Sequence, residues 1–177
     1  MPSGKTHDVI TVILAVPAFA VTYSVTRSVG AATVAAAAVI IGGVMFGPDL
    51  DTVSRQYSRW MMFRFLWYPY QKFFKHRSRF THGLIFGALG RVVYFLGVLT
   101  LVTFVVVYVW TAYSGGKLPN ITEFTRAWQP IGQFVRANFG EHFLMTVFAG
   151  LWLGAASHTF TDMAGSFVKT GRVAKFL

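Results

Sequence analysis

Aspartate and histidine residues gather in a few short polar motifs of a chain that is otherwise strongly apolar. The chain has only four aspartates, and each lies in one of these motifs, together with four of the five histidines. Imidazole and carboxylate groups ligate divalent metal ions, and ionisable groups are costly to keep near lipid. Their concentration predicts a shared metal site with the candidate ligands His7, Asp8, Asp49, Asp51, His76, His82, His158 and Asp162.

The spacing within the motifs suits ligation. His158 and Asp162 are four residues apart, so on a helix both can ligate one ion, or the carboxylate can orient the imidazole. Pro48 disfavours a continued helix, and in an extended stretch Asp49 and Asp51 would point the same way. Two such carboxylates repel unless a cation, an arginine or a proton intervenes. The alternatives without metal are an ordinary hydrogen-bonded pair and a solvated loop.

The size of the set bears on the chemistry. Four histidines and four aspartates exceed the needs of one tetrahedral zinc ion and would suffice for two ions, which can clamp a phosphoester. Asp49 is a candidate catalytic base, with Asp51 as the alternative. Arg77 is a candidate catalytic residue because arginine binds oxyanions in bidentate fashion. The chain has no cysteine, so we expect a divalent ion held by imidazole and carboxylate: zinc first, then manganese, iron or nickel.

The elements that must position these residues are apolar helices. Of the 177 residues, 54% are hydrophobic and 12% are charged, whereas soluble domains have about 25% charged residues. A membrane-spanning helix needs about 20 residues, and four runs reach or approach that length. The sequence therefore predicts an all-α, polytopic membrane protein with a single domain over residues 1–177 and about four antiparallel spans at 9–26, 29–47, 84–112 and 143–163.

This topology brings the motifs together. With four antiparallel spans, the motifs before the first and third runs and those after the second and near the end of the fourth fall on one membrane face. Eleven of the 16 lysines and arginines lie on that side, so the positive-inside rule makes it cytoplasmic. The net charge of +10 is interpreted as membrane anchoring and not as nucleic acid binding. The first run is interpreted as a span, because cleavage of a secretory signal there would discard a motif.

Two connecting segments have the composition of interfacial helices. Residues 52–75 alternate basic and aromatic side chains, which suits contact with anionic lipid headgroups. Residues 114–141, on the opposite side, also contain spaced aromatic residues but no chemistry-bearing motif. Membrane lipids are therefore the expected partners, and the sequence does not identify a protein partner.

The ordered motifs resemble a family of bacterial, largely cyanobacterial, metal-binding proteins of undefined activity. The resemblance covers nearly the whole chain through Ser3–Asp8, Gly47–Asp51, Ser54–Tyr57, His76–Ser78, Thr81–Gly83 and Ser157–Asp162. It implies a polytopic helical protein of a bacterial inner membrane, or of a cyanobacterial thylakoid or plasma membrane. It also implies a metal site at His7, Asp49, Asp51, His76, His82, His158 and Asp162. The motif order is similar to that of inner-membrane metal-dependent hydrolases, although Thr52 stands where that group often has histidine.

Three functions use the same residues. The leading hypothesis is a metal-dependent hydrolase of a phosphoester or lipid headgroup at the cytoplasmic membrane face. The alternative is a non-catalytic membrane assembly or interaction protein in which metal or a polar network locks the helix ends together. Metal transport ranks third, because it predicts ligands near the bilayer midplane, whereas the motifs lie at helix ends.

Overall fold

The computed structural model describes residues 3–74, 78, 81, 83, 85–118 and 120–171. Helices and turns make up these ranges, and no strand occurs in them, which confirms the predicted all-α class. In chain order the elements are α1 (Gly4–Thr26), α2 (Val29–Met45), η1 (Pro48–Asp51), α3 (Arg55–Arg59), η2 (Met61–Trp67), α4 (Tyr68–Phe73), α6 (Phe86–Tyr113), α7 (Ile121–Ala127), α8 (Gln129–Phe139) and α9 (Phe143–Thr170).

Three helices, α1, α6 and α9, are long and apolar enough to cross a membrane. The second predicted span, α2, is apolar but has only 17 residues. The fourth predicted span is longer than expected: α9 continues to Thr170, so His158 lies near the middle of the helix and not near its end. The length and composition of these helices indicate a membrane protein.

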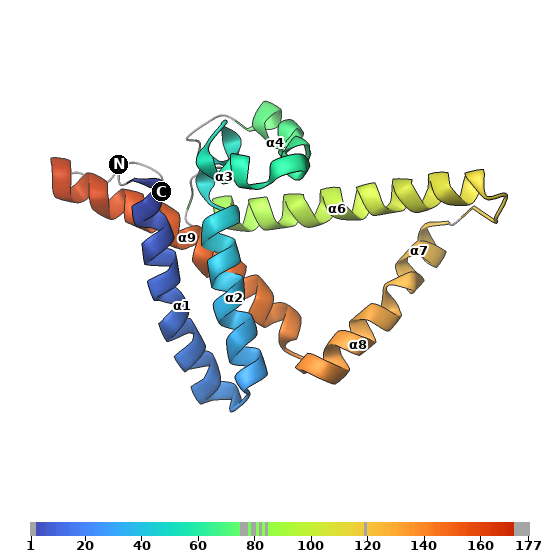
Figure 1. The fold of residues 1–177 in the computed structure, drawn as a ribbon, viewed down its shortest axis with the longest axis horizontal. Helices are drawn as coiled ribbons and strands as arrows, with labels where there is room; N and C mark the ends of the chain where they lie inside the picture. Colours follow the sequence, from blue (N-terminus) through green and yellow to red (C-terminus); the bar gives the residue numbers. More distant parts are fainter. Residues whose placement is uncertain are drawn as a thin grey trace.

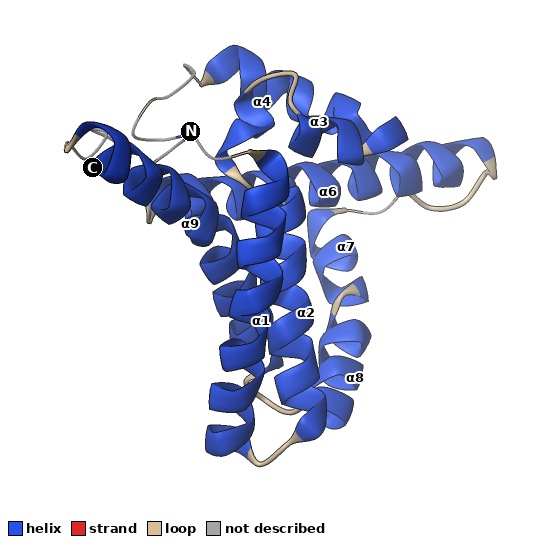
Figure 2. Cartoon of the chain, turned by 60° about the vertical axis from the view of Figure 1, so that its left-hand side comes forward, coloured by secondary structure: helices blue, strands red, loops and turns tan. Residues whose placement is uncertain are grey.

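Helices α1 and α2 form a tight hairpin whose caps are local. Arg27 has a left-handed backbone with φ 54° and donates its N–H to Tyr23 O, which ends α1. The Ser28 side chain accepts from Ala31 N and begins α2. The two helices consequently lie side by side, as Figures 1 and 2 both show.

Helix α9 packs against α2 because glycines remove the side chains between the two backbones. A Cβ atom on Gly154 would lie 2.0 Å from Val39 O, and one on Gly42 would lie 2.2 Å from Leu151 O. Small residues allow this close approach of helices where lipid supplies no hydrophobic driving force. The pairing fixes the middle of α9 beside α2 and α1.

Helix α6 departs from this group. It starts near the end of α2 and extends away from it, and α7 and α8 then lead back to the start of α9 (Figure 1). Its buried residues, among them Ala88 and Val92, belong to the first two turns. Further along, Val105, Trp110 and Tyr113 are exposed. A large apolar surface on this helix is therefore left for lipid.

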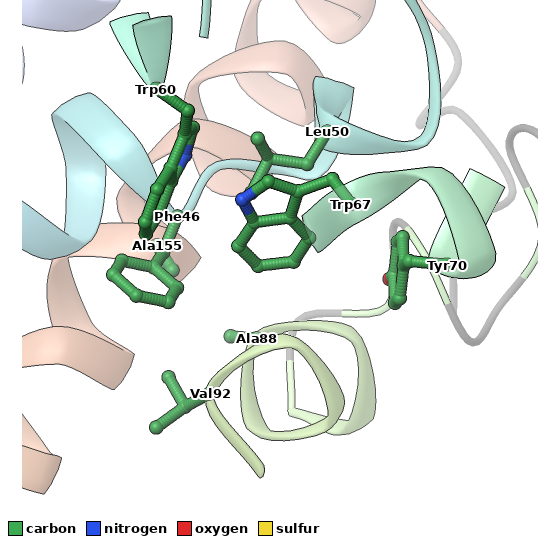
Figure 3. Close-up of a cluster of buried hydrophobic side chains, with 8 residues drawn as sticks. All are labelled: Phe46, Leu50, Trp60, Trp67, Tyr70, Ala88, Val92 and Ala155. Carbon is green, nitrogen blue, oxygen red and sulfur yellow. The ribbon is translucent and has the colours of Figure 1, made fainter. Parts of the chain in front are cut away.

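Within the segment 52–75 that was predicted as interfacial, the described residues 52–74 fold into α3, η2 and α4 over the start of α6 (Figure 1). Figure 3 shows Trp67 between Trp60 and Tyr70, on one side of Ala88. These four residues form a buried cluster with Phe46, Leu50, Val92 and Ala155. Several of the aromatic rings assigned to the headgroup region thus form a core. Phe63 and Phe65 stay exposed.

The same core buries one charge. Arg91 of α6 is fully buried and donates from Nε to Phe46 O at 2.7 Å and from Nη1 to Thr81 O. It caps the carbonyl that ends α2, and hence links α6 to the segment that leads into η1. The guanidinium of Arg91 thus faces protein.

Candidate metal centre

Three buried side chains converge where the first turns of α1 meet the middle of α9. His7 lies on α1, and His158 and Asp162 lie one turn apart on α9. One ligand atom from each of the three falls within 4.8 Å of the others. His7 Nε2 is 3.2 Å from Asp162 Oδ1, and His158 Nε2 is 3.9 Å from Asp162 Oδ2. The predicted pairing of His158 with Asp162 on one helix face is present, and it gains a second imidazole from α1.

The distance between two of the donor atoms fits a bound metal ion. His7 Nδ1 and Asp162 Oδ1 are buried with no hydrogen-bond partner in the part of the chain that the structure describes. Two ligands about 2.0–2.1 Å from a tetrahedral ion lie about 3.3 Å apart, close to the 3.2 Å between His7 Nε2 and Asp162 Oδ1. Two imidazole nitrogens and a carboxylate oxygen are donors that zinc, manganese, iron and nickel accept.

The two imidazoles lie face to face. The ring centroids of His7 and His158 are 3.6 Å apart and the rings are parallel. Both Nε2 atoms lie within 4 Å of the Asp162 carboxylate. The arrangement brings two nitrogen donors to one side of a shared oxygen donor.

Gln56 of α3 holds His158 from behind. Its Nε2 lies 2.9 Å from His158 Nδ1 and donates to Gly43 O at 3.2 Å. Gly47 makes room for this side chain, since a Cβ there would lie 1.9 Å from Gln56 Nε2. A ligating histidine is commonly fixed through its other ring nitrogen. The contact with Gln56 therefore fixes the orientation of the His158 ring.

Contacts of Thr11 help to position the turn of α1 that carries His7. Thr11 Oγ1 donates to His7 O at 2.9 Å and lies 3.5 Å from Ser157 Oγ on α9. A Cβ on Gly43 would lie 2.3 Å from Thr11 Oγ1. The absence of a side chain at this glycine of α2 therefore lets α1 and α2 approach closely at the turn of α1 that follows His7.

The side chains of Asp49 and Asp51 lie in different surroundings. Because Pro48 begins a 3₁₀ helix and not an extended stretch, residues two apart point in different directions, and the expectation that both face the same way is wrong. Asp49 is 41% exposed, with Oδ2 3.7 Å from His158 Nε2. Asp51 is buried and near Tyr70, whose pKa is raised chiefly by burial. Only Asp49 joins the three ligands.

Asp8 is engaged elsewhere. Its two carboxylate oxygens accept from Arg59 Nη1 at 3.0 Å and Nη2 at 2.6 Å, and Arg59 Nη1 also donates to Val44 O. This bidentate pair ties α3 to the start of α1 and the end of α2. In the structure Asp8 therefore supports the site and lies outside the group of three ligands.

The three ligands lie at one cavity of about 210 Å³. Its lining comprises Gly4, His7, Asp8, Asp49, Arg55, Gln56, Arg59, His158 and Asp162. The cavity opens beside the ligands and is walled by two arginines, so an ion held there would be accessible to a small anionic group. This places residues from α1, η1, α3 and α9 at one site.

Three predicted site residues, His76, Arg77 and His82, lie outside the described residues. In turn, three residues at the site were not among the candidates: Gln56, Arg55 and Arg59. The motif Ser54–Tyr57, part of the family resemblance, contains two of them, but sequence spacing alone did not join α3 to a ligand on α9.

The comparisons with known proteins agree with this geometry. No curated protein and no solved structure matches the chain. A family model described as uncharacterized metal-binding protein (DUF2227) matches residues 2–172. The family match and the buried histidine and aspartate group are independent, and they indicate the same chemistry. The chain belongs to this family of metal-binding proteins.

Proposed function

We propose that this chain is an integral membrane hydrolase that uses a divalent metal ion to cleave a phosphoester or a lipid headgroup. The observation that carries the proposal is the composition of one cavity: three buried ligands, a partly exposed carboxylate and two arginines. A purely structural metal site is closed by four ligands, whereas a catalytic site keeps a position open. Three ligands beside a cavity match the second pattern.

His7, His158 and Asp162 would hold the ion, with zinc expected first. When bound, such an ion supplies Lewis-acid chemistry: it polarises a phosphoester oxygen and makes water more acidic. The two oxygens of Asp162 lie 3.2 Å from His7 Nε2 and 3.9 Å from His158 Nε2, and Gln56 fixes the orientation of His158. The chain's own contribution is then to hold the three donor side chains in position on α1 and α9.

Asp49 is the best candidate for the base. Its Oδ2 lies 3.7 Å from His158 Nε2, and at 41% exposure it is the most accessible carboxylate near the ligands. A carboxylate so placed can take a proton from a water molecule in the cavity and release it to solvent. Asp162, at 5% exposure, lacks that access and suits ligation.

The setting of the cavity suggests its substrates. It lies beside apolar helices long enough to cross a membrane, at the end of α1 that carries Lys5 and close to the basic segment with Arg64 and Lys72. By the positive-inside rule this end would face the cytoplasm. Anionic headgroups are the expected lipid partners, because basic residues near a membrane surface attract them.

The test separates metal binding from turnover. The full chain, purified in detergent, is analysed for bound metal and assayed against phosphoesters and phospholipids. We expect Asp49→Asn to keep the metal and lose turnover about 100-fold or more, the usual effect of removing a general base. Glu141→Gln, the same chemical change before α9 begins, is the matched control. Equal turnover by the two variants would remove Asp49 from the mechanism, and a metal-free wild-type chain would refute the proposal.

A second function is favoured by the origin of the ligands. His7 and the pair on α9 come from opposite ends of the sequence and are buried, so an ion between them would hold α1 against α9. A non-catalytic membrane protein could use metal in this way for assembly. It predicts that metal raises the unfolding temperature of a chain that turns over none of the substrates.

A further inference from the structure

Among the described residues, Arg55 is the one arginine in the cavity wall whose guanidinium lies open. Its side chain is exposed, and no described residue forms a hydrogen bond or ion pair with it. Its position is nevertheless set by packing, because Cδ and Nη1 lie 3.6 Å and 3.9 Å from where a Cβ of Gly4 would stand. The guanidinium is thus held against the start of α1, one turn before the ligand His7.

Arg59, the other arginine of the wall, is not available in the same way. Both of its terminal nitrogens are used by Asp8, and Nη1 also donates to Val44 O. The pair is about three-quarters buried on each side. The two arginines therefore have different roles: Arg59 braces the cavity, and Arg55 lines it with an exposed guanidinium that forms no hydrogen bond to a described residue.

The charges of the cavity match an anion once a metal is present. Three carboxylates, those of Asp8, Asp49 and Asp162, and the two guanidinium groups line it. A divalent ion at the three ligands leaves one positive charge in excess, which resides on Arg55 because Arg59 is neutralised by Asp8. Without the ion the same lining has one negative charge in excess. Anion binding should hence depend on metal, and metal on anion, through one coupling free energy.

We propose that Arg55 binds a phosphate group that lies beside the metal ligands. Guanidinium offers two parallel donors that fit phosphate oxygens, and a phosphate has further oxygens that can face the ion. The inference rests on the proposed function and deepens it by naming the substrate class and the residue that selects it. The phosphate can be free or part of a lipid headgroup, since both present the same oxyanion.

The probe is inorganic phosphate added to the full chain loaded with Mn²⁺ in detergent. Paramagnetic Mn²⁺ broadens the ³¹P signal of a phosphate held near it, so one titration reports both affinity and proximity. Arg55→Gln should lower the affinity for phosphate about tenfold or more, the usual effect of losing a hydrogen bond to a charged group. Arg55→Lys should fall between, because it keeps the charge and loses the fork.

Arg64→Gln is the matched control, since Arg64 is an exposed arginine of η2 that does not line the cavity. It should leave the phosphate affinity unchanged, and none of the variants should lose Mn²⁺ from the wild-type stoichiometry. Phosphatidylcholine nanodiscs with and without phosphatidic acid distinguish the source. Broadening of the phosphatidic acid signal supports a headgroup, and broadening of inorganic phosphate alone supports a free phosphate; both outcomes sustain the role of Arg55.

Two results would overturn the inference. One is an equal phosphate affinity for the wild type and Arg55→Gln; the other is no phosphate binding by a wild-type chain that holds Mn²⁺. The hydrolase proposal fails separately: phosphate binding that depends on Arg55, in a chain that turns over no phosphoester, keeps the anion site and removes the reaction. A chain that binds no metal would remove both.

Discussion

Two regions of the molecule both contain many apolar residues, but they place them in different surroundings. The cavity region, formed by the start of α1, the end of α2, residues 48–74 and the middle of α9, buries its aromatic and polar side chains against protein. The outer region, residues 97–118 and 120–139, leaves Trp110, Tyr113 and Phe134 exposed. Both regions thus contain many apolar residues, whereas close backbone packing and buried ionisable groups occur in the cavity region.

The difference shows where specificity is encoded. In the outer region any apolar side chain of suitable length satisfies a lipid surface. In the cavity region glycines set backbone distances and polar side chains need particular partners, such as Gln56 with His158. Substitutions should therefore have strong effects in the cavity region and weak effects in the outer region. The following predictions test that contrast.

The largest effect is expected from one methyl group. Gly154→Ala places a Cβ 2.0 Å from Val39 O, which forces α9 away from α2, and overpacking of this kind costs about 3 kcal/mol of unfolding free energy. Gly97→Ala, on the part of α6 where a Cβ meets no atom within 4 Å, should be neutral or stabilising by up to about 1 kcal/mol. Reversible unfolding in mixed micelles measures both changes, and effects of the same sign would contradict the contrast.

Metal removal should come next. When the free metal concentration is about 100 times its Kd for the folded chain, binding adds about 2.7 kcal/mol to the free energy of unfolding. Chelation should therefore lower the unfolding temperature of the wild type. His158→Ala should abolish this response, because it removes a ligand in the cavity region. His142→Ala, at the start of α9 and distant from the ligands along that helix, should retain it. A chelation response that survives in His158→Ala would mean that the stabilising ion binds elsewhere.

The sequence predicted the class of the fold and the meeting of the motifs, because apolar runs and helical spacing are local signals. It placed His7, Asp49, His158 and Asp162 on one side through chain topology, and the structure joins them. It did not predict that Asp49 and Asp51 diverge, because the choice between a 3₁₀ turn and an extended stretch after Pro48 depends on tertiary packing.

The contacts made by the site's arginines and by Gln56 depend on tertiary structure still more. The pairing of Asp8 with Arg59 spans 51 positions, and the contact of Gln56 with His158 spans 102. No periodicity links such residues. The same is true of Trp67. Its amphipathic side chain suits a membrane interface, but in the structure it is fully buried. Amphipathic aromatic residues suit both locations, so composition alone cannot assign one.

Two ion pairs allow a smaller test of the contrast. Asp8 and Arg59 are bidentate and mostly buried, with exposures of 27% and 24%, so Asp8→Asn should cost about 1 kcal/mol. Lys117 and Glu123 in the outer region are much more exposed, at 84% and 40%, and Lys117→Gln should leave the unfolding temperature unchanged. Thermal unfolding of the two variants measures the difference, and equal shifts would show that burial does not decide the strength of these pairs.

The smallest effect concerns the protonation of Glu123. The hydrogen bond from Lys117, and then that from the Asn120 backbone N–H, lower the pKa of this carboxyl. A lowered pKa stabilises the fold at pH values above the ordinary carboxyl range, and that contribution is lost as the pH falls through the folded-state pKa. Carbon-13 labelling of glutamate gives signals from only two residues, and Glu123→Gln identifies the one in α7. Lys117→Gln and added salt should each raise the pKa of Glu123, because an exposed pair is screened by ions. A pKa unmoved by salt would mean that the outer region shields its charges as the cavity region does.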